Sequence, residues 1–198
     1  MRFLLPDEAR ALLLELKTRS LPVYRMAILS LHAGLRLGEI TKIKWQHINF
    51  EHRQLTLVDT KNGESRMAFM TDSVFQMFSE MEYGAANDLV FPSKNKNEIQ
   101  FLSHTFSRVV SSLGLNDGVT DRRMKVVFHS LRHSCASHLA MNGADMSTIQ
   151  AVLGHKTLAM AQRYAHLTDE HIKKSVELLQ NVWNPKEAEV IPIGGRAG

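Results

Sequence analysis

One short stretch of alternating residues interrupts a chain whose apolar residues otherwise recur at helical spacing. Residues 54–58 and 66–70 alternate apolar and polar side chains, the two-residue period of a strand, and a polar turn at 59–65 separates them. On both sides of this hairpin the apolar residues recur every three or four positions, which is the period of an α-helix. The sequence therefore predicts an α+β fold that is mainly helical, with a small antiparallel β-sheet packed on helices.

Proline, glycine and acidic residues indicate where the predicted helices begin and end. The first helix covers residues 7–18, because Pro6 suits a helix start and the acidic residues that follow suit the positive end of the helix dipole. A second helix runs from Pro22 and stops near Gly34, and a third begins around Leu37. Further helices are predicted at 71–82, 103–113, 130–142 and 146–153, and one more begins near Thr157.

Composition fits one globular domain, predicted at residues 1–183 and followed by a flexible tail at 184–198. The 198 residues are 44% apolar, and 24 Lys+Arg against 20 Asp+Glu give a net charge of +4, which permits a polyanionic partner without requiring one. The single cysteine excludes an internal disulfide framework. No apolar run resembles a membrane span or a signal peptide, so a cytoplasmic protein that does not associate with membranes is expected.

Arginine, histidine and tyrosine gather near the C-terminal end of the chain in a combination that suits phosphate chemistry. His129 and Arg132 are three residues apart, so at the start of a helix both lie on one face. Arginine can bind a phosphate through two parallel N–H bonds, histidine can transfer a proton near neutral pH, and a tyrosine hydroxyl can carry a phosphate covalently. A surface polar pair is the alternative interpretation of His129 and Arg132 taken alone.

Gly154 determines how a second histidine and the tyrosine can be arranged. His155 and Tyr164 are nine residues apart, and on one continuous helix they would lie on opposite sides. A glycine at 154 ends the preceding helix and leaves His155 in a turn. Tyr164 is then expected on a new helix for which Thr157 is the N-cap, so the two side chains can serve one site.

Four short motifs, taken in order, resemble the conserved boxes of the tyrosine recombinase, or phage integrase, family. They are Ala33-Gly34-Leu35-Arg36-Leu37-Gly38-Glu39-Ile40, His129-Ser130-Leu131-Arg132-His133, Leu153-Gly154-His155-Lys156 and Tyr164. Each motif alone is a weak signal, but four in this order and at these separations, across residues 5–175, make a strong one. The resemblance implies a site-specific recombinase or integrase catalytic domain. Such a domain cuts and rejoins DNA strands through a 3′-phosphotyrosyl intermediate, without metal, cofactor or nucleotide.

The resemblance also implies roles for two arginines and the tyrosine. Arg36 and Arg132 would grip the non-bridging oxygens of the scissile phosphate, where their planar forks stabilise developing charge. Tyr164 would attack the phosphorus and release a 5′-hydroxyl, and because a free phenol titrates near pH ~10 it needs help from nearby cations and a base. Ordinary salt bridges, for example between Arg36 and Glu39, are the alternative for the arginines, and a half-buried tyrosine with a satisfied hydroxyl is the alternative for Tyr164.

The remaining roles that the resemblance implies concern proton transfer and phosphate binding. His129 would act in proton transfer at the nucleophile, and His155 would hydrogen-bond the phosphate. Lys61, in the hairpin turn, resembles the lysine that protonates the departing 5′-oxygen. A helix-capping histidine is the alternative for His129 and His155, and a solvated turn lysine is the alternative for Lys61.

Two expectations concern metal and the DNA backbone. His129 and His133 are four residues apart, but position 130 is serine, so the zinc-protease pattern His-Glu-x-x-His is absent and no metal site is predicted. Basic residues outside the catalytic set are expected to follow the DNA backbone, with solvated surface charge as the alternative for each. These predicted DNA-binding residues are Arg66, Arg122, Arg123, Lys125 and Lys156.

The resemblance implies double-stranded DNA as the partner and a homotetramer assembled on it, and it leaves room for accessory DNA-bending proteins. The apolar residues of 172–183 recur at helical spacing and would pack either on their own core or on a neighbouring protomer. Members usually carry another helical domain before this region, so a chain that starts at the catalytic domain is expected to be truncated or minimal. Two other functions stay open: a catalytically silent DNA-binding accessory protein of the same fold, and type IB topoisomerase-like strand relaxation.

Overall fold

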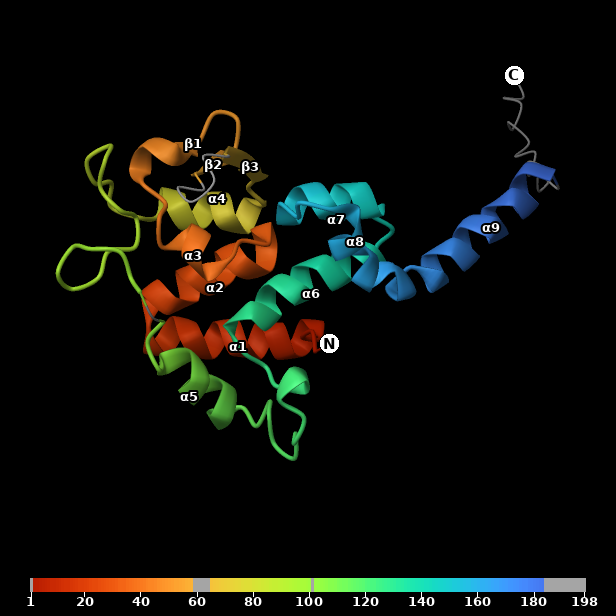
Figure 1. Cartoon of the computed structure of the whole chain (residues 1–198), viewed down its shortest axis with the longest axis horizontal. Helices are drawn as coiled ribbons and strands as arrows, with labels where there is room; N and C mark the ends of the chain where they lie inside the picture. Colours follow the sequence, from red (N-terminus) through yellow and green to blue (C-terminus); the bar gives the residue numbers. More distant parts are fainter. Residues whose placement is uncertain (1, 59–64, 101, 184–198) are drawn as a thin grey trace, which may run out of the picture.

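The chain folds into a mainly helical α+β structure with one small sheet, as a computed structural model shows (Figure 1). The structure describes residues 2–58, 65–100 and 102–183. Lys61 and the predicted tail at 184–198 lie outside the described residues. The fold class that the hydrophobic periods predict is confirmed.

Helices precede and follow the sheet in the order that the sequence predicts. In chain order the elements are α1 (Pro6–Arg19), α2 (Leu21–Ala33), α3 (Leu37–Ile40), η1 (Trp45–His47), β1 (Ile48–Asn49), β2 (Gln54–Val58), β3 (Ser65–Phe69), α4 (Asp72–Ser79), α5 (Thr105–Ser112), η2 (Arg122–Met124), α6 (Phe128–Met141), α7 (Met146–Leu153), α8 (Leu158–Ala161), η3 (Gln162–Leu167) and α9 (Asp169–Trp183). No helix among the described residues is long and apolar enough to cross a membrane.

The sheet is an antiparallel hairpin with a third short strand added at one edge. Its order is β1-β2-β3, and β2 pairs with β3 in the register that sets Leu55 opposite Ala68 and Leu57 opposite Arg66. Leu55, Leu57 and Ala68 are buried in the main hydrophobic core. The alternation of the sequence thus places one face of β2 on the helices, while β1 is a strand that the sequence pattern did not single out.

Two groups of buried side chains hold the fold together. The larger one is centred on α2, which is apolar on most of its surface and packs against α1, α4 and α6. The smaller one joins α6, α7, α8 and η3 through Ala136, Ala140, Ile149, Ala161 and Tyr164, among others. Because α6 takes part in both groups, it links the N-terminal helices to the segment that carries Tyr164.

The segment around Tyr164 differs from the prediction. Gly154 ends α7 in the left-handed conformation, with φ 59°, and Thr157 is at the N-cap of α8, although its side chain makes no capping hydrogen bond. However, α8 ends at Ala161, and Tyr164 lies on the 3₁₀-helix η3 rather than on the helix that begins after Thr157. Tighter 3₁₀ turns commonly continue the ends of α-helices, and this one packs Tyr164 against α6.

Helix α9 extends away from the body of the molecule (Figure 1). Its five described large apolar side chains are all at least half exposed, namely Ile172, Val176, Leu178, Leu179 and Trp183. The helical spacing predicted for this segment is confirmed. These side chains do not pack on the core of their own chain, and docking on a neighbouring protomer stays a prediction.

Candidate functional site

A cavity of about 650 Å³ opens between α3, the sheet and the turn that joins α7 to α8. Its charged lining residues are Arg36, Glu39, Lys42, Arg66 and Lys156. Among the described residues the lining therefore holds four cationic side chains and one carboxylate. His155 also lines this cavity. An excess of positive charge in a concave surface favours an anionic ligand.

Glu39 is the centre of the cationic group. Its carboxylate accepts hydrogen bonds from Arg36 Nη1 at 3.1 Å and from Arg66 Nε and Nη2 at 3.2 and 3.0 Å. It also accepts the backbone N–H of Arg36, and Arg132 Nη1 lies 3.8 Å from Oε2. Burial acts to raise the pKa of Glu39, but the bonds and charges of Arg66 and Arg36 outweigh it and hold that pKa below its ordinary value. One carboxylate therefore holds three guanidinium groups together and leaves positive charge in excess.

Arg132 is buried, with 2% of its surface exposed, and it ties two helix ends together. Its Nη1 donates to the carbonyl of Gly34, which follows α2, and its Nη2 donates to the carbonyl of Leu153 at the end of α7, both at 2.5 Å. Burial, followed by the charge of Arg36, lowers the pKa of Arg132 to about 10. The side chain is therefore still a cation at neutral pH. Through its two hydrogen bonds it also stabilises the packing of α2 and α7.

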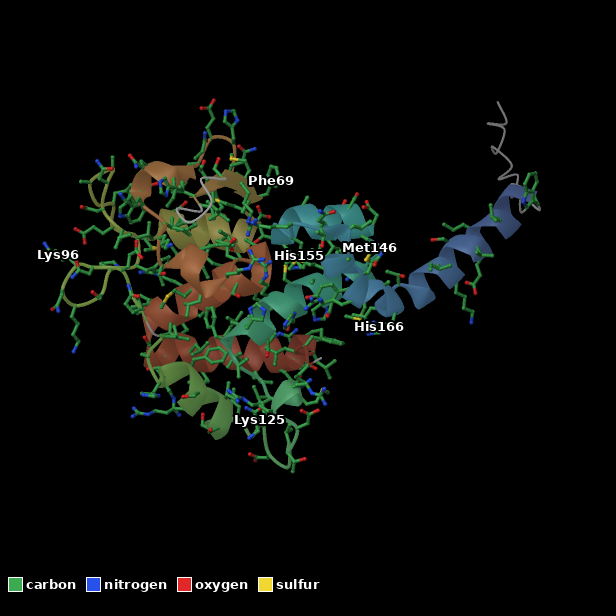
Figure 2. All side chains as sticks on the ribbon, in the orientation of Figure 1. Phe69, Lys96, Lys125, Met146, His155 and His166 are labelled. Carbon is green, nitrogen blue, oxygen red and sulfur yellow. The ribbon has the colours of Figure 1, made fainter. Side chains whose placement is uncertain are left out.

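His155 lies in the turn after Gly154, as predicted, at the end of α7 that meets α2 (Figure 2). Its backbone N–H donates to Gln150, and its ring Nδ1 is buried without a hydrogen-bond partner. Burial and the charges of Arg132 and Arg36 lower the pKa of His155 to about 4. A neutral imidazole with an unpaired nitrogen therefore sits beside the cationic group.

Tyr164 is almost fully buried, with 4% of its surface exposed, and does not line the cavity. Its hydroxyl is 2.7 Å from Nδ1 of His133. Burial raises the pKa of Tyr164 above its ordinary value, against a smaller lowering by the charges of Arg163 and Arg132. The phenol is therefore protonated in this state, and a positive charge lies close to it.

The other predicted site residues do not all lie at the cavity. His129 is exposed on α6, with its ring centroid 4.5 Å from that of His133. Lys156 lines the cavity, and Arg66 is held there by Glu39 and by the carbonyl of Val152. Lys61 lies outside the described residues. In the sequence Lys61 comes between Val58, where β2 ends, and Ser65, where β3 begins, and both of these residues line the cavity.

Three of the predicted DNA-binding residues lie away from the cavity. Arg122 and Arg123 are exposed on η2, and Lys125 follows directly. Figure 2 shows Lys125 on the far side of α1 from His155. Arg123 pairs with Asp121. The structure thus brings Arg36, Arg66, His155 and Lys156 together around one cavity, with Arg132 behind Glu39, but it does not bring the η2 residues there.

Sequence reasoning missed the roles of Glu39 and His133. The spacing of Glu39 from Arg36 indicated a salt bridge, but the contribution of Arg66 depends on a strand that lies 27 residues later. His133 entered only as part of a motif, and nothing in the sequence paired it with a tyrosine 31 residues away. Among the described residues, no group of three or more His, Cys, Asp or Glu side chains is placed to hold a metal ion.

Replacing Glu39 by Gln is expected to lower the free energy of unfolding by about 2–3 kcal/mol at pH 7, because three guanidinium groups lose their counter-charge. Since the pKa of Glu39 is lowered in the folded state, its stabilisation is present above the ordinary carboxyl pKa and is lost as the pH falls through the lowered value. Urea denaturation between pH 7 and pH 3 should therefore show the two proteins converging. Glu51→Gln, in an exposed turn, is the control, and a Glu39→Gln effect no larger than this one would contradict the prediction.

Replacing Gly154 by Ala is expected to lower the free energy of unfolding by about 2–3 kcal/mol. The left-handed backbone accounts for part of this loss, and a new Cβ only 2.3 Å from Cδ of Arg66 accounts for the rest by displacing that arginine from Glu39. Gly118→Ala is a matched control, because Gly118 has φ 70° but no atom within 4 Å of an added Cβ. Equal losses in the two variants, measured by urea denaturation, would show that the Arg66 contact has no effect.

Comparison with known proteins links the chain to one family. A family model described as the phage integrase family matches residues 2–171. The tyrosine recombinase XerA of Pyrococcus furiosus is 32% identical over 165 residues, which are 80% of this chain and 56% of that protein. The integrase of Escherichia phage P2 is 29% identical over 154 residues, 78% of this chain and 40% of that protein. The chain thus spans about half the length of the curated relatives that it matches.

Solved structures share the fold. The catalytic domain of bacteriophage HP1 integrase superimposes with a TM-score of 0.64 at 24% identity, covering 94% of this chain and 99% of that one. The XerH site-specific recombinase bound to its difH substrate superimposes with a TM-score of 0.70 at 20% identity, covering 94% of this chain and 55% of that one. At these identities the likeness concerns the fold.

Proposed function

Because the chain belongs to the phage integrase family, we propose that it forms the catalytic part of a site-specific recombinase that cuts and rejoins DNA strands. The observation that carries this proposal is the group of Arg36, Arg66 and Arg132 held around Glu39 beside a cavity, with His155 in its wall. Such a group can bind a phosphodiester. Tyr164, within the electrostatic reach of Arg132, supplies a nucleophile.

The scissile phosphate is expected to bind at the cationic group. Of the three arginines around Glu39, Arg36 is the most exposed, at 39% of its side chain. Its contact with Glu39 can therefore be exchanged for a contact with phosphate. Arg132 contributes positive charge from its buried position, where two carbonyl groups fix its guanidinium group. The neutral imidazole of His155 can donate one hydrogen bond to a non-bridging oxygen. Fixed donors of this kind stabilise the charge that develops in the transition state.

The reaction conserves the energy of the phosphodiester bond. Oη of Tyr164 forms a bond to phosphorus, the bond from phosphorus to O5′ breaks, and a 3′-phosphotyrosyl link remains. The departing O5′ takes a proton, and we assign the donation of this proton to Lys61, which comes between β2 and β3 in the sequence. Attack by the 5′-hydroxyl of another strand reverses these steps and reseals the DNA, so the reaction needs no nucleotide.

Tyr164 must approach the phosphate before this reaction can start. The tyrosine is buried and does not line the cavity, so in this conformation it cannot reach a phosphate bound there. We infer that DNA binding brings η3 and the phosphate together. The short α8 and η3 segments rest on a small apolar group, which makes this part of the chain easier to move than the larger core.

Double-stranded DNA is the proposed partner, and two observations support it. The positive cavity suits a phosphate backbone. Two structures with the same fold, those of XerH and of the Tn1549 transposon integrase, are complexes with DNA. The exposed apolar residues of α9 support a second proposal, that protomers assembled on DNA dock α9 on one another and reach the predicted tetramer.

A covalent trapping experiment tests the proposal without knowledge of the target sequence. The chain is incubated with a library of nicked suicide duplexes that have random sequence around the nick, and protein–DNA adducts are recovered under denaturing conditions and sequenced. We expect adducts on a 3′-phosphate, enriched for one sequence. Binding without any adduct would instead indicate a silent accessory protein. Relaxation of supercoiled DNA without joining to a second duplex would indicate topoisomerase-like activity.

A further inference from the structure

Arg66 is the arginine that the sheet contributes to the cationic group. It lies on β3 opposite Leu57, so its side chain is on the face of the hairpin where Leu57 and Ala68 are buried. The Arg66 side chain is only 20% exposed. A guanidinium group that loses most of its water needs acceptors from the protein, because an unpaired buried charge is costly.

All three nitrogen atoms of the Arg66 guanidinium group donate to the protein itself. Nε and Nη2 donate to the two carboxylate oxygens of Glu39 at 3.2 and 3.0 Å, and Nη1 donates to the carbonyl of Val152 at 3.0 Å. Paired bonds to a carboxylate fix the orientation of the two groups as well as their distance. The side chain therefore joins the sheet to α3 and to α7 in one defined geometry.

Through Glu39, Arg66 acts on the main chain of Arg36. Oε2 of Glu39 accepts from Nη2 of Arg66, and it also accepts the backbone N–H of Arg36 at 2.7 Å, at the start of α3. This backbone contact is separate from the bond between Glu39 and the Arg36 side chain. When the side chain of Arg36 exchanges Glu39 for phosphate, the backbone contact can stay. The point from which Arg36 reaches into the cavity is then unchanged.

Through Val152, Arg66 acts on the turn that carries His155. The carbonyl of Val152 belongs to the last turn of α7, three residues before His155. The carbonyls of the last turn of a helix have no partner within the helix, so donors from outside fix its end. Arg132 binds the next carbonyl, that of Leu153. Two arginines from different elements thus hold the end of α7 from which His155 enters the cavity wall.

We propose that Arg66 is a positioning residue for strand cutting, which holds Arg36 and His155 in place relative to each other. The inference rests on the proposed function. In this role Arg36 and His155 contact the phosphate, whereas Arg66 acts through Glu39 and the carbonyl of Val152 without touching DNA. Donors that are fixed before the reaction stabilise the transition state without having to rearrange during it.

Replacing Arg66 by Lys separates this role from a direct contact with DNA. Lysine keeps a positive charge that can attract phosphate, but it cannot bond both oxygens of Glu39 and the carbonyl of Val152 in one plane. We expect single-turnover adduct formation at saturating protein to slow by about 10-fold to 10²-fold, with DNA affinity within about twofold of the wild type. Duplexes that the wild-type chain selects are the substrates.

Arg19→Lys is the matched control for Arg66→Lys. The exposed Arg19 pairs with Glu15 on α1, so this variant also alters an arginine–glutamate pair, and it should react at the wild-type rate. A full wild-type rate in folded Arg66→Lys, with only its stability lowered, would show a merely structural pair and overturn the proposal. A loss confined to DNA affinity would indicate a direct contact and overturn it as well.

A double-mutant cycle shows whether Arg66 acts through Glu39. Arg66→Gln and Glu39→Gln each break the pair, so each is expected to slow adduct formation in protein that circular dichroism shows to be folded. The double variant should then react nearly as fast as Arg66→Gln alone. A double variant that is slower by the whole factor of Glu39→Gln would show independent roles and overturn the proposal. If Arg66→Gln does not fold, Arg66→Lys takes its place in the cycle.

The same measurements distinguish the two proposals. Wild-type adducts together with full rates in the Arg66 variants would overturn the positioning role alone, and strand cutting would still be supported. A wild-type chain that binds DNA but forms no adduct would overturn strand cutting and the role of Arg66 with it.

Discussion

Replacing Tyr164 by Phe is expected to abolish adduct formation on suicide duplexes, with a loss on the order of 10⁴-fold or more. Phenylalanine keeps the ring in the small apolar group of α6, α7 and α8 but removes the one oxygen that can bond to phosphorus. The fold should survive, because only the hydrogen bond to His133 is lost, at a cost of about 1 kcal/mol. DNA binding, measured by gel shift, should be unchanged.

Tyr83→Phe is the matched control for this prediction. Tyr83 is 57% exposed and packs on Trp45, far along the chain from Tyr164. Its variant should form adducts at the wild-type rate. Adducts that persist in Tyr164→Phe would show that another side chain is the nucleophile, and peptide mapping of the trapped DNA would identify it.

Replacing Arg132 by Leu is expected to lower the free energy of unfolding by about 3–5 kcal/mol, the largest stability change that we predict. The buried guanidinium donates to the carbonyls of Gly34 and Leu153, and both would be left without that donor. Glu39 would also lose one of its three cations. A loss of this size is a large part of the stability of an ordinary domain, so urea denaturation should show a marked fall in midpoint.

The same residue should matter for DNA cutting, and Arg132→Lys separates the two effects. Lysine keeps the charge but cannot reach two carbonyl groups in the planar geometry of the fork. We expect it to recover part of the stability while adduct formation in the folded protein still falls by about 10²–10³-fold. Arg122→Leu, on the exposed η2, should change stability by no more than about 0.5 kcal/mol. An Arg132→Leu variant as stable as Arg122→Leu would contradict the structural role.

Most of the fold could be predicted because its elements follow from local patterns. The helices that bury one apolar face, such as α1 and α4, and the alternating hairpin of β2 and β3 are set by periods of 3.6 and 2 residues. Gly154 could be assigned as a helix end because its left-handed backbone favours glycine. The 3₁₀-helix that carries Tyr164 could not be predicted, since its tighter turn depends on packing against α6.

The site could be predicted in its parts but not in its contacts. The residue types and spacing of Arg36, Arg132, His155 and Tyr164 are enough to indicate phosphate chemistry. The grouping of Arg36, Arg66 and Arg132 around Glu39 was not visible, because these three arginines come from separate parts of the chain. The predicted DNA contacts were the least informative part, since a basic residue on η2 and one beside the cavity look alike in a sequence.

The sequence by itself determined which chemical groups the protein has, how they are spaced and which secondary structure carries most of them, because these depend on neighbours along the chain. Only the tertiary structure decided that Glu39 gathers three arginines, that Arg132 is buried between two helix ends, and that the hydroxyl of Tyr164 contacts His133 and does not line the cavity. These contacts join residues 21 to 98 positions apart in the case of Arg132, and 31 in the case of Tyr164. Burial then lowers the pKa of Arg132 and raises the pKa of Tyr164, and these shifts exist only once the chain has packed.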